Sequence, residues 1–225
     1  MFRDREDAGL QLAERFKGRA LKDPLVLAIP RGGVVTGAVL ARALGAELDI
    51  VLARKLRAPY QHELAVGALG EDGEVYLSDF ARGVMGVDDA YLARERAHQT
   101  EEIAKRRERF RAVRPAAEVA GRSVIVVDDG VATGSTMLAA LHVLKARHPY
   151  ELIVAVPVAP PETVDLLARY CDEVECLLEP AFLGGISAFY GDFTQVEDAE
   201  ALRLLSELQR PPGAATESKA ERREP

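Results

Sequence analysis

Two adjacent aspartates, Asp128 and Asp129, follow a short apolar run in the stretch SVIVVDDGVATGSTM, residues 123–137. The apolar residues 124–127 are typical of a buried strand, and the residues from Ser135 onward have the spacing of a helix. Carboxylates at the end of a buried strand need hydrogen-bond donors, and the vicinal hydroxyls of a sugar are suitable donors. The pair therefore indicates a site for a sugar.

The loop between these acids and the helix consists of small and hydroxylated residues. A helix N-terminus presents unpaired N–H groups and a partial positive charge, so it favours an anion such as phosphate. Gly134 lets the backbone approach a phosphate closely, and Ala132 adds no bulk. Hydroxyl donors come from Thr133, Ser135 and Thr136. Acids and loop together predict a cradle for a ribose 5-phosphate.

Other phosphate-binding loops have different residues. The stretch lacks the lysine of a Walker A loop and has no G-x-G-x-x-G pattern. An isolated pair of aspartates would suit helix-capping or magnesium-binding acids of another α/β protein, such as a response-regulator-like one. The ordered combination of four apolar residues, the acid pair, two further residues and A-T-G-S-T favours the phosphosugar interpretation.

Two basic motifs occur at the ends of other predicted strands. Arg31, Gly32 and Gly33 follow the apolar run 24–30, and Arg54 and Lys55 close the run 48–56. Taken alone, the first motif is more often a strand–helix turn and the second a pair of solvated bases. Because the carboxyl ends of parallel strands lie at one edge of a sheet, the motifs together predict a basic cluster there, suited to a diphosphate.

Strand and helix signals alternate along most of the chain. Continuous apolar runs predict buried strands over 24–30, 48–56, 124–127, 151–159 and 173–178, and helical spacing occurs over 10–16, 34–45, 135–147 and 161–170. Buried strands separated by helices are typical of a parallel sheet covered on both faces. The predicted fold class is α/β, doubly wound and mainly parallel.

Two regions interrupt this alternation. Residues 57–78 suggest a hairpin around the turn GEDG, and residues 88–113 form a polar helix with interleaved charges and a thin apolar stripe. We expect one domain over 1–210, with an insertion at 57–113 and a small cap at 179–210. The polar residues 211–225 predict a disordered tail.

The composition narrows the class of protein. The 225 residues carry a net charge of −7, which argues against a general nucleic-acid binder. An 18-residue apolar span is absent and the N-terminal residues are charged, so we expect a cytoplasmic protein without membrane contact. Cys171 and Cys176 lack the companions of a zinc site and suggest free thiols.

The stretch 124–137 is almost letter for letter the donor-binding signature of the type I phosphoribosyltransferases, and the chain resembles a poorly characterised bacterial branch of that family. The resemblance implies that Asp128 and Asp129 hold the ribose hydroxyls. It also implies that Arg31, Gly32 and Gly33 form a diphosphate loop, with a cis peptide at Arg31–Gly32. The implied 5-phosphate loop and its approach comprise Gly130, Val131, Ala132, Thr133, Gly134, Ser135 and Thr136.

The same resemblance implies an activity. A 5-phosphoribosyl group would pass from 5-phosphoribosyl 1-diphosphate to a nitrogenous base or similar acceptor, with Asp128, Asp129, Arg31 and Lys55 as the catalytic set. Arg54 would assist at the diphosphate. Mg²⁺ would be held mainly by diphosphate and ribose rather than by direct protein ligands. The insertion would be a lid, with His62 and Glu63 as candidate contacts, and a homodimer acting in nucleotide salvage is expected.

The acceptor is the least constrained part of this prediction. Enzymes of the family that use 6-oxopurines have an acid where this chain has Ala132, which argues against hypoxanthine or guanine. The aromatic residues Phe182, Phe189 and Tyr190 are candidates for an acceptor pocket. Two alternatives remain: a non-catalytic regulator that senses the donor or a nucleotide, and a hydrolase of nucleotides or phosphosugars.

Overall fold

A five-stranded parallel sheet forms the core of the computed structural model, which describes residues 1–61, 64–78 and 81–208. Its strands lie in the order β2-β1-β6-β7-β8. Their bounds are β1 Leu25–Ala28, β2 Glu47–Ile50, β6 Ser123–Val127, β7 Glu151–Val158 and β8 Glu173–Leu178. The chain runs outward from β1 to β2 and returns to β6 on the other side of β1. This reversal creates a crevice at the carboxyl ends of β1 and β6, where ligands bind in such sheets.

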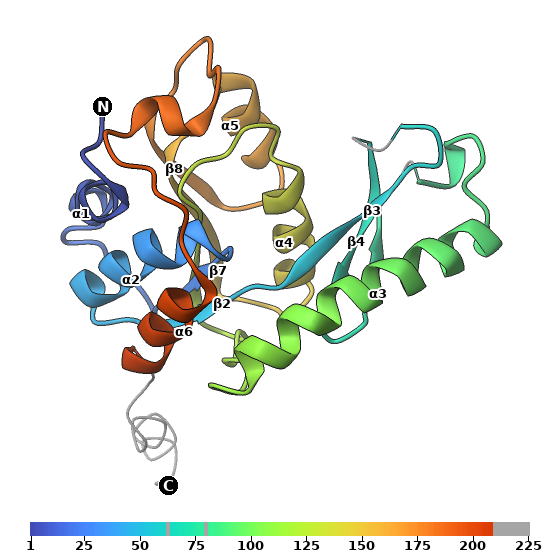
Figure 1. The fold of residues 1–225 in the computed structure, drawn as a ribbon, viewed down its shortest axis with the longest axis horizontal. Coiled ribbons are helices and arrows are strands. Elements are labelled where there is room, and N and C mark those ends of the chain that lie inside the picture. Colours follow the sequence, from blue (N-terminus) through green and yellow to red (C-terminus); the bar gives the residue numbers. More distant parts are fainter. Residues whose placement is uncertain (62–63, 79–80, 209–225) are drawn as a thin grey trace, which may run out of the picture.

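Helices cover both faces of this sheet, which confirms the doubly wound fold. Alternate strand residues face opposite sides, so that Val26 and Ala28 join one core cluster and Leu25 and Leu27 the other. The first face packs against α1, α2 and α6, and the second against α4 and α5 (Figure 1). The helices are α1 Arg5–Arg15, α2 Gly32–Leu44, α4 Ser135–Lys145, α5 Pro161–Leu167 and α6 Asp198–Glu207.

A second, antiparallel sheet stands to one side of the core. It contains β3 Ala53–Arg57, β4 Ala65–Gly70 and β5 Val75–Leu77, and the hairpin predicted around GEDG joins β4 to β5. A short 3-10 helix, η1 Ala81–Gly83, leads to the long helix α3 Asp89–Arg111, which runs along this sheet (Figure 1). We call these four elements, β3, β4, β5 and α3, the arm.

The prediction of a single strand over 48–56 is wrong. The chain leaves the core sheet after Ile50, crosses at the buried residues Val51 and Leu52, and enters the arm at Ala53. The apolar run continues through the crossing because the crossing itself is buried, so the pattern cannot show where one sheet ends. Arg54 and Lys55 therefore lie on the arm and not at the end of a core strand.

The arm contacts the core through ion pairs and through apolar side chains. Near the carboxyl end of α3, Arg111 donates to Asp49 of β2 at 2.8 Å and to Glu71 of the β4–β5 turn at 2.6 Å. Further along, β3 and β4 rest on α4 through small apolar side chains, with Ala68 packed against Ala139 and Val143. The arm is thus joined to the core by the ion pairs of Arg111 and by a contact of small side chains with α4.

The C-terminal region contains a loop with a 3-10 helix, η2 Ile186–Phe189, and then α6, whose Leu204 and Leu205 pack into the core. Phe2 pairs with Tyr190 in an isolated bridge, so the N-terminus lies against this loop. The predicted disordered tail and the lid candidates His62 and Glu63 lie outside the described residues. Within the described ranges, no helix has the length and apolar character needed to cross a bilayer.

Candidate active site

The loop after β6 leads into α4 at the crevice between β1 and β6. Gly134 occupies the left-handed region with φ 76°, which allows the chain to turn sharply into the helix. The Thr163 hydroxyl of the neighbouring helix α5 donates to the Ala132 carbonyl at 2.6 Å and fixes the loop. No side chain of the described residues caps α4, so its first-turn N–H groups are available to an anion.

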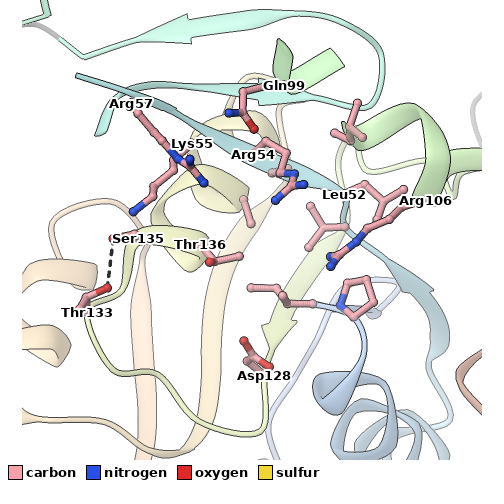
Figure 2. A pocket seen from close by; sticks show the side chains of 16 residues that line it. Leu52, Arg54, Lys55, Arg57, Gln99, Arg106, Asp128, Thr133, Ser135 and Thr136 are labelled. Carbon is pink, nitrogen blue, oxygen red and sulfur yellow. Dashed lines mark hydrogen bonds between the residues drawn. The ribbon is translucent and has the colours of Figure 1, made fainter. Parts of the chain in front are cut away.

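A cavity of about 510 Å³ opens at this loop. Asp128 lies at its base, the hydroxyls of Thr133, Ser135 and Thr136 lie on one side, and side chains of the arm lie above (Figure 2). Thr133 and Ser135 hold each other through a 3.1 Å hydroxyl contact. Hydroxyl donors and a carboxylate in one cavity match the predicted cradle for a phosphosugar.

The two neighbouring aspartates point to different places. Asp128 lines the cavity, and its Oδ1 accepts the backbone N–H of Asp129 at 2.9 Å. Burial, followed by the nearby charge of Asp129, raises the pKa of Asp128 well above the usual aspartate range. Asp129 instead accepts a 2.7 Å hydrogen bond from Arg5 Nε and is 9% exposed. Of the predicted ribose-binding pair, only Asp128 faces the cavity formed by the described residues.

The turn after β1 packs directly against this acid pair. A Cβ atom on Gly33 would lie 2.8 Å from the Val127 carbonyl, and one on Gly32 would lie 1.8 Å from Asp129 Oδ2. Both glycines are therefore required for the close approach of the two loops. The predicted cis peptide is displaced by one residue: it joins Pro30 to Arg31, while Arg31–Gly32 opens α2, whose helical peptide bonds are trans.

Arg31 is oriented toward α6. Its Nη1 lies 3.6 Å from Asp198 and 3.9 Å from Glu197, and its side chain is 35% exposed. Ile29 and Pro30, rather than Arg31, supply the wall of the cavity at this turn. The structure thus brings the backbone of the predicted diphosphate loop to the site, with the Arg31 side chain beside it.

Basic side chains from the arm gather above the cavity. Arg54 and Lys55 line it as predicted, together with Arg57 of β3 and Arg106 of α3, which the sequence analysis did not identify (Figure 2). Arg54 Nη2 donates to Glu102 at 3.0 Å. The Nε atoms of Arg54 and Arg57 are buried without a hydrogen-bond partner in the described part of the chain. Each of these two guanidinium groups therefore keeps one unsatisfied hydrogen-bond donor among the described residues.

The aromatic residues predicted for an acceptor pocket do not line the cavity described above. Phe182 is 86% exposed, whereas Tyr190 is buried with its ring 5.2 Å from that of Phe2 and 4.9 Å from that of Phe193. The Tyr190 hydroxyl donates to the Asp129 carbonyl at 2.6 Å, and burial raises its pKa. The ring packs on Phe2 and Phe193, and the hydroxyl is hydrogen-bonded to the Asp129 backbone. Tyr190 therefore supports the backbone of the acid pair, and its ring is not available for stacking on a base.

A second cavity, of about 350 Å³, shares Thr133 and Ser135 with the first and lies on the far side of this pair. Its other walls are mainly apolar and include Leu138, Leu166 and Tyr170. Phe182, Phe189 and Tyr190 line neither of these two cavities.

Comparison with known proteins identifies relatives. A model of the phosphoribosyl transferase domain matches residues 8–188. Two curated Mycobacterium tuberculosis proteins, from strains CDC 1551 and H37Rv, are each 40% identical over 210 residues, which is 93% of this chain and 47% of each relative. Both are provisionally named as phosphoribosyl transferases, and the chain spans about half their length.

A solved structure has the same fold over most of this chain. The crystal structure of TT1426 from Thermus thermophilus is 46% identical, covers 93% of this chain and 99% of its own, and superposes with a TM-score of 0.89. Since the domain model matches most of the chain and its residues form the cavity described above, the chain belongs to the phosphoribosyl transferase domain family.

Proposed function

We propose that the protein is a pentosyltransferase that moves the 5-phosphoribosyl group from 5-phosphoribosyl 1-diphosphate to a nitrogenous base or similar acceptor and releases diphosphate. One observation carries this proposal. A single cavity joins a helix N-terminus with hydroxyl donors, the carboxylate Asp128, and a cluster of cations from the arm. These three features match, in order, the 5-phosphate, the ribose hydroxyls and the diphosphate of the donor.

The proposed orientation follows from charge. The 5-phosphate would lie on the N–H groups and hydroxyls of residues 132–136, with no lysine needed. The ribose would extend over Asp128, and the diphosphate would lie beneath Arg54, Lys55 and Arg57. In this arrangement like charges stay apart, because Asp128 is separated from both phosphate groups by the sugar ring.

The residues would act mainly by positioning and electrostatics. Breaking the C1–O bond leaves a ribosyl group with oxocarbenium character and places the electron pair on the departing diphosphate. Guanidinium and ammonium groups fixed above the cavity would stabilise that growing negative charge without reorganising. A covalent nucleophile is unnecessary, because the loop and Asp128 hold the ribose still while the acceptor nitrogen attacks C1.

Mg²⁺ fits this site as an ion held largely by the donor. The described residues contain no group of three or more His, Cys, Asp or Glu side chains able to hold a metal, whereas Asp128 and the loop hydroxyls offer oxygen atoms within the cavity. Such an arrangement suits an ion that keeps most of its coordination to phosphate and water. When bound, Mg²⁺ would neutralise part of the diphosphate charge, and Asp128 is the residue placed to orient it.

A diphosphate-release assay with purified protein, donor, Mg²⁺ and a panel of bases tests the proposal. Release that requires one particular base supports the transferase. Release of diphosphate without any base would contradict the transferase and indicate a hydrolase. Donor binding without turnover on the whole panel would contradict it and indicate a regulator. Ala132 predicts that hypoxanthine and guanine are poor acceptors. The expected homodimer is tested separately by sedimentation analysis.

A further inference from the structure

Helix α3 is long and mostly solvated, yet it buries one regular stripe. Of its 23 residues, Gln99, Ile103 and Phe110 are buried, and they follow each other at intervals of four and seven. Arg106 lies three residues after Ile103 and four before Phe110, so it falls on the same face of the helix. An arginine therefore occupies the position where the stripe would otherwise continue with an apolar side chain, and it remains exposed there.

The Arg106 side chain lines the cavity of about 510 Å³ at the loop after β6, which we call the donor cavity because the proposed donor would bind there. Arg106 lines the cavity together with Gln99 and Ile103, and Figure 2 shows its guanidinium directed between Leu52 and the turn after β1. Its position is set from the next turn of the helix, because Arg111 ties α3 to Asp49 of the core sheet. Arg106 is thus held over the cavity by a neighbour that is itself firmly anchored.

Arg106 has no ion-pair partner of its own among the described residues. Arg109 on the same helix pairs with Asp198 at 2.6 Å, and Arg54 pairs with Glu102 at 3.0 Å. Arg106 makes no ion pair with any carboxylate of the described residues, while Arg54 and Arg31 lie near enough to oppose its charge. Partial desolvation first, and then these two cations, lower the pKa of Arg106, while Asp198 and Glu102, already paired with Arg109 and Arg54, oppose this shift more weakly. Such a cluster of like charges is stabilised by a bound anion.

We propose that Arg106 binds the diphosphate end of the donor, which makes α3 a wall of the binding site as well as a support for the arm. The inference rests on the proposed function and adds a residue to it. A guanidinium presents two parallel N–H groups that match two phosphate oxygens, which a lysine at this position would not reproduce.

Arg106→Gln tests the proposal, with Arg107→Gln, which lines neither cavity, as the matched control on the same helix turn. Binding of three ligands is measured by calorimetry with Mg²⁺: 5-phosphoribosyl 1-diphosphate, inorganic diphosphate and ribose 5-phosphate. We expect Arg106→Gln to weaken the first two by about 10- to 100-fold, as for a lost charged hydrogen bond, and to leave ribose 5-phosphate within about twofold. Arg107→Gln should bind all three as the unaltered protein does.

Several results would overturn the role of Arg106. They are unchanged diphosphate binding in Arg106→Gln, an equal loss for ribose 5-phosphate, and full recovery of diphosphate affinity by Arg106→Lys. Circular dichroism and thermal unfolding of the variant exclude misfolding as the cause of a loss. If the unaltered protein binds neither the donor nor diphosphate, the proposed function itself fails, and this result is distinct from a failure confined to the variant.

Discussion

Arg5 Nε lies 2.7 Å from Asp129 Oδ2, which connects the first helix to a residue 124 positions later, beside the donor cavity. Both side chains are largely buried, with exposed fractions of 10% and 13%. The Arg5 guanidinium also lies 3.8 Å from the centre of the Phe193 ring. The N-terminal helix, the acid pair and the C-terminal loop therefore meet at this ion pair.

Breaking this pair should destabilise the fold. Arg5→Met leaves the Asp129 carboxylate buried without its partner, and we expect the free energy of unfolding to fall by roughly 3–5 kcal/mol. Arg5→Met/Asp129→Asn should recover part of that loss, because no unpaired charge remains. Urea denaturation of the two single variants and the double variant measures the coupling. Arg3→Ala, which removes the exposed Arg3–Asp4 pair, serves as the control; purely additive effects at positions 5 and 129 would contradict the argument.

Gly32 should tolerate no side chain. In Gly32→Ala the new Cβ would meet Asp129 Oδ2 at 1.8 Å, so the carboxylate must move away from Arg5. We expect a loss of roughly 1–3 kcal/mol in unfolding free energy, as for an overpacked site, and weaker donor binding. Gly83→Ala is a suitable control, since its Cβ would meet nothing within 4 Å. Equal melting temperatures for the two variants would show that the contact is not as tight as described.

Asp128 links stability to pH through its raised pKa. The folded protein retains the proton at pH values where the unfolded chain has lost it. The stability contributed by this group is therefore complete below the usual aspartate pKa and is lost as pH rises through the folded-state pKa. Asp128→Asn does not ionise, so at neutral pH we expect it to melt higher than the unaltered protein, by roughly 2–4 °C for each kcal/mol of penalty removed.

Asp128→Asn should also bind 5-phosphoribosyl 1-diphosphate more weakly than the unaltered protein does. A carboxylate accepts hydroxyl hydrogen bonds better than an amide does, so donor affinity should fall at least about 10-fold in Asp128→Asn. For the unaltered protein, donor affinity should increase with pH as Asp128 ionises. Melting curves and calorimetry across the acidic to neutral range test both statements. A variant that melts lower at neutral pH, or that binds donor normally, would contradict the assignment of Asp128.

Arg111 should determine how firmly the arm is attached. Its partners Asp49 and Glu71 are 2% and 9% exposed. Arg111→Met leaves the buried Glu71 carboxylate unpaired and leaves Asp49 with only the more distant Arg114, at 3.7 Å. We expect a loss of roughly 3–5 kcal/mol and faster amide exchange in β3, β4 and β5. Hydrogen exchange followed by mass spectrometry makes the comparison, with Arg107→Met as the control. Unchanged exchange in these strands would mean that other contacts hold the arm.

The sequence was sufficient for the core fold because buried parallel strands leave unambiguous apolar runs. The runs at 124–127, 151–159 and 173–178 all became core strands, and the helix after Gly134 begins at Ser135 as expected. The loop that precedes it could be identified because its small and hydroxylated residues occur in the fixed order of the family's donor-binding signature.

Contacts between distant segments could not be predicted. Nothing near Arg5 or Asp129 indicates that they pair, and the aromatic character of Tyr190 suits core packing as well as stacking on a base. Arg57 had a usable signal, because it lies two residues after Lys55 on one strand and shares its face. Arg106 had a weaker signal: its spacing from Ile103 and Phe110 places it on the face of the thin apolar stripe, but only the docking of α3 shows that this face meets the cavity.

Ala68 of the arm packs on Ala139 and Val143 of α4 through short side chains, and this contact has a consequence for the exchange of small molecules. Short side chains do not interlock, and the two sheets share no ladder of main-chain hydrogen bonds among the described strands. We therefore expect the arm to tilt against α4 while the hydrogen-bonded framework of each sheet stays intact. Admission of a reactant and departure of a product would then require a tilt of the arm and no local melting.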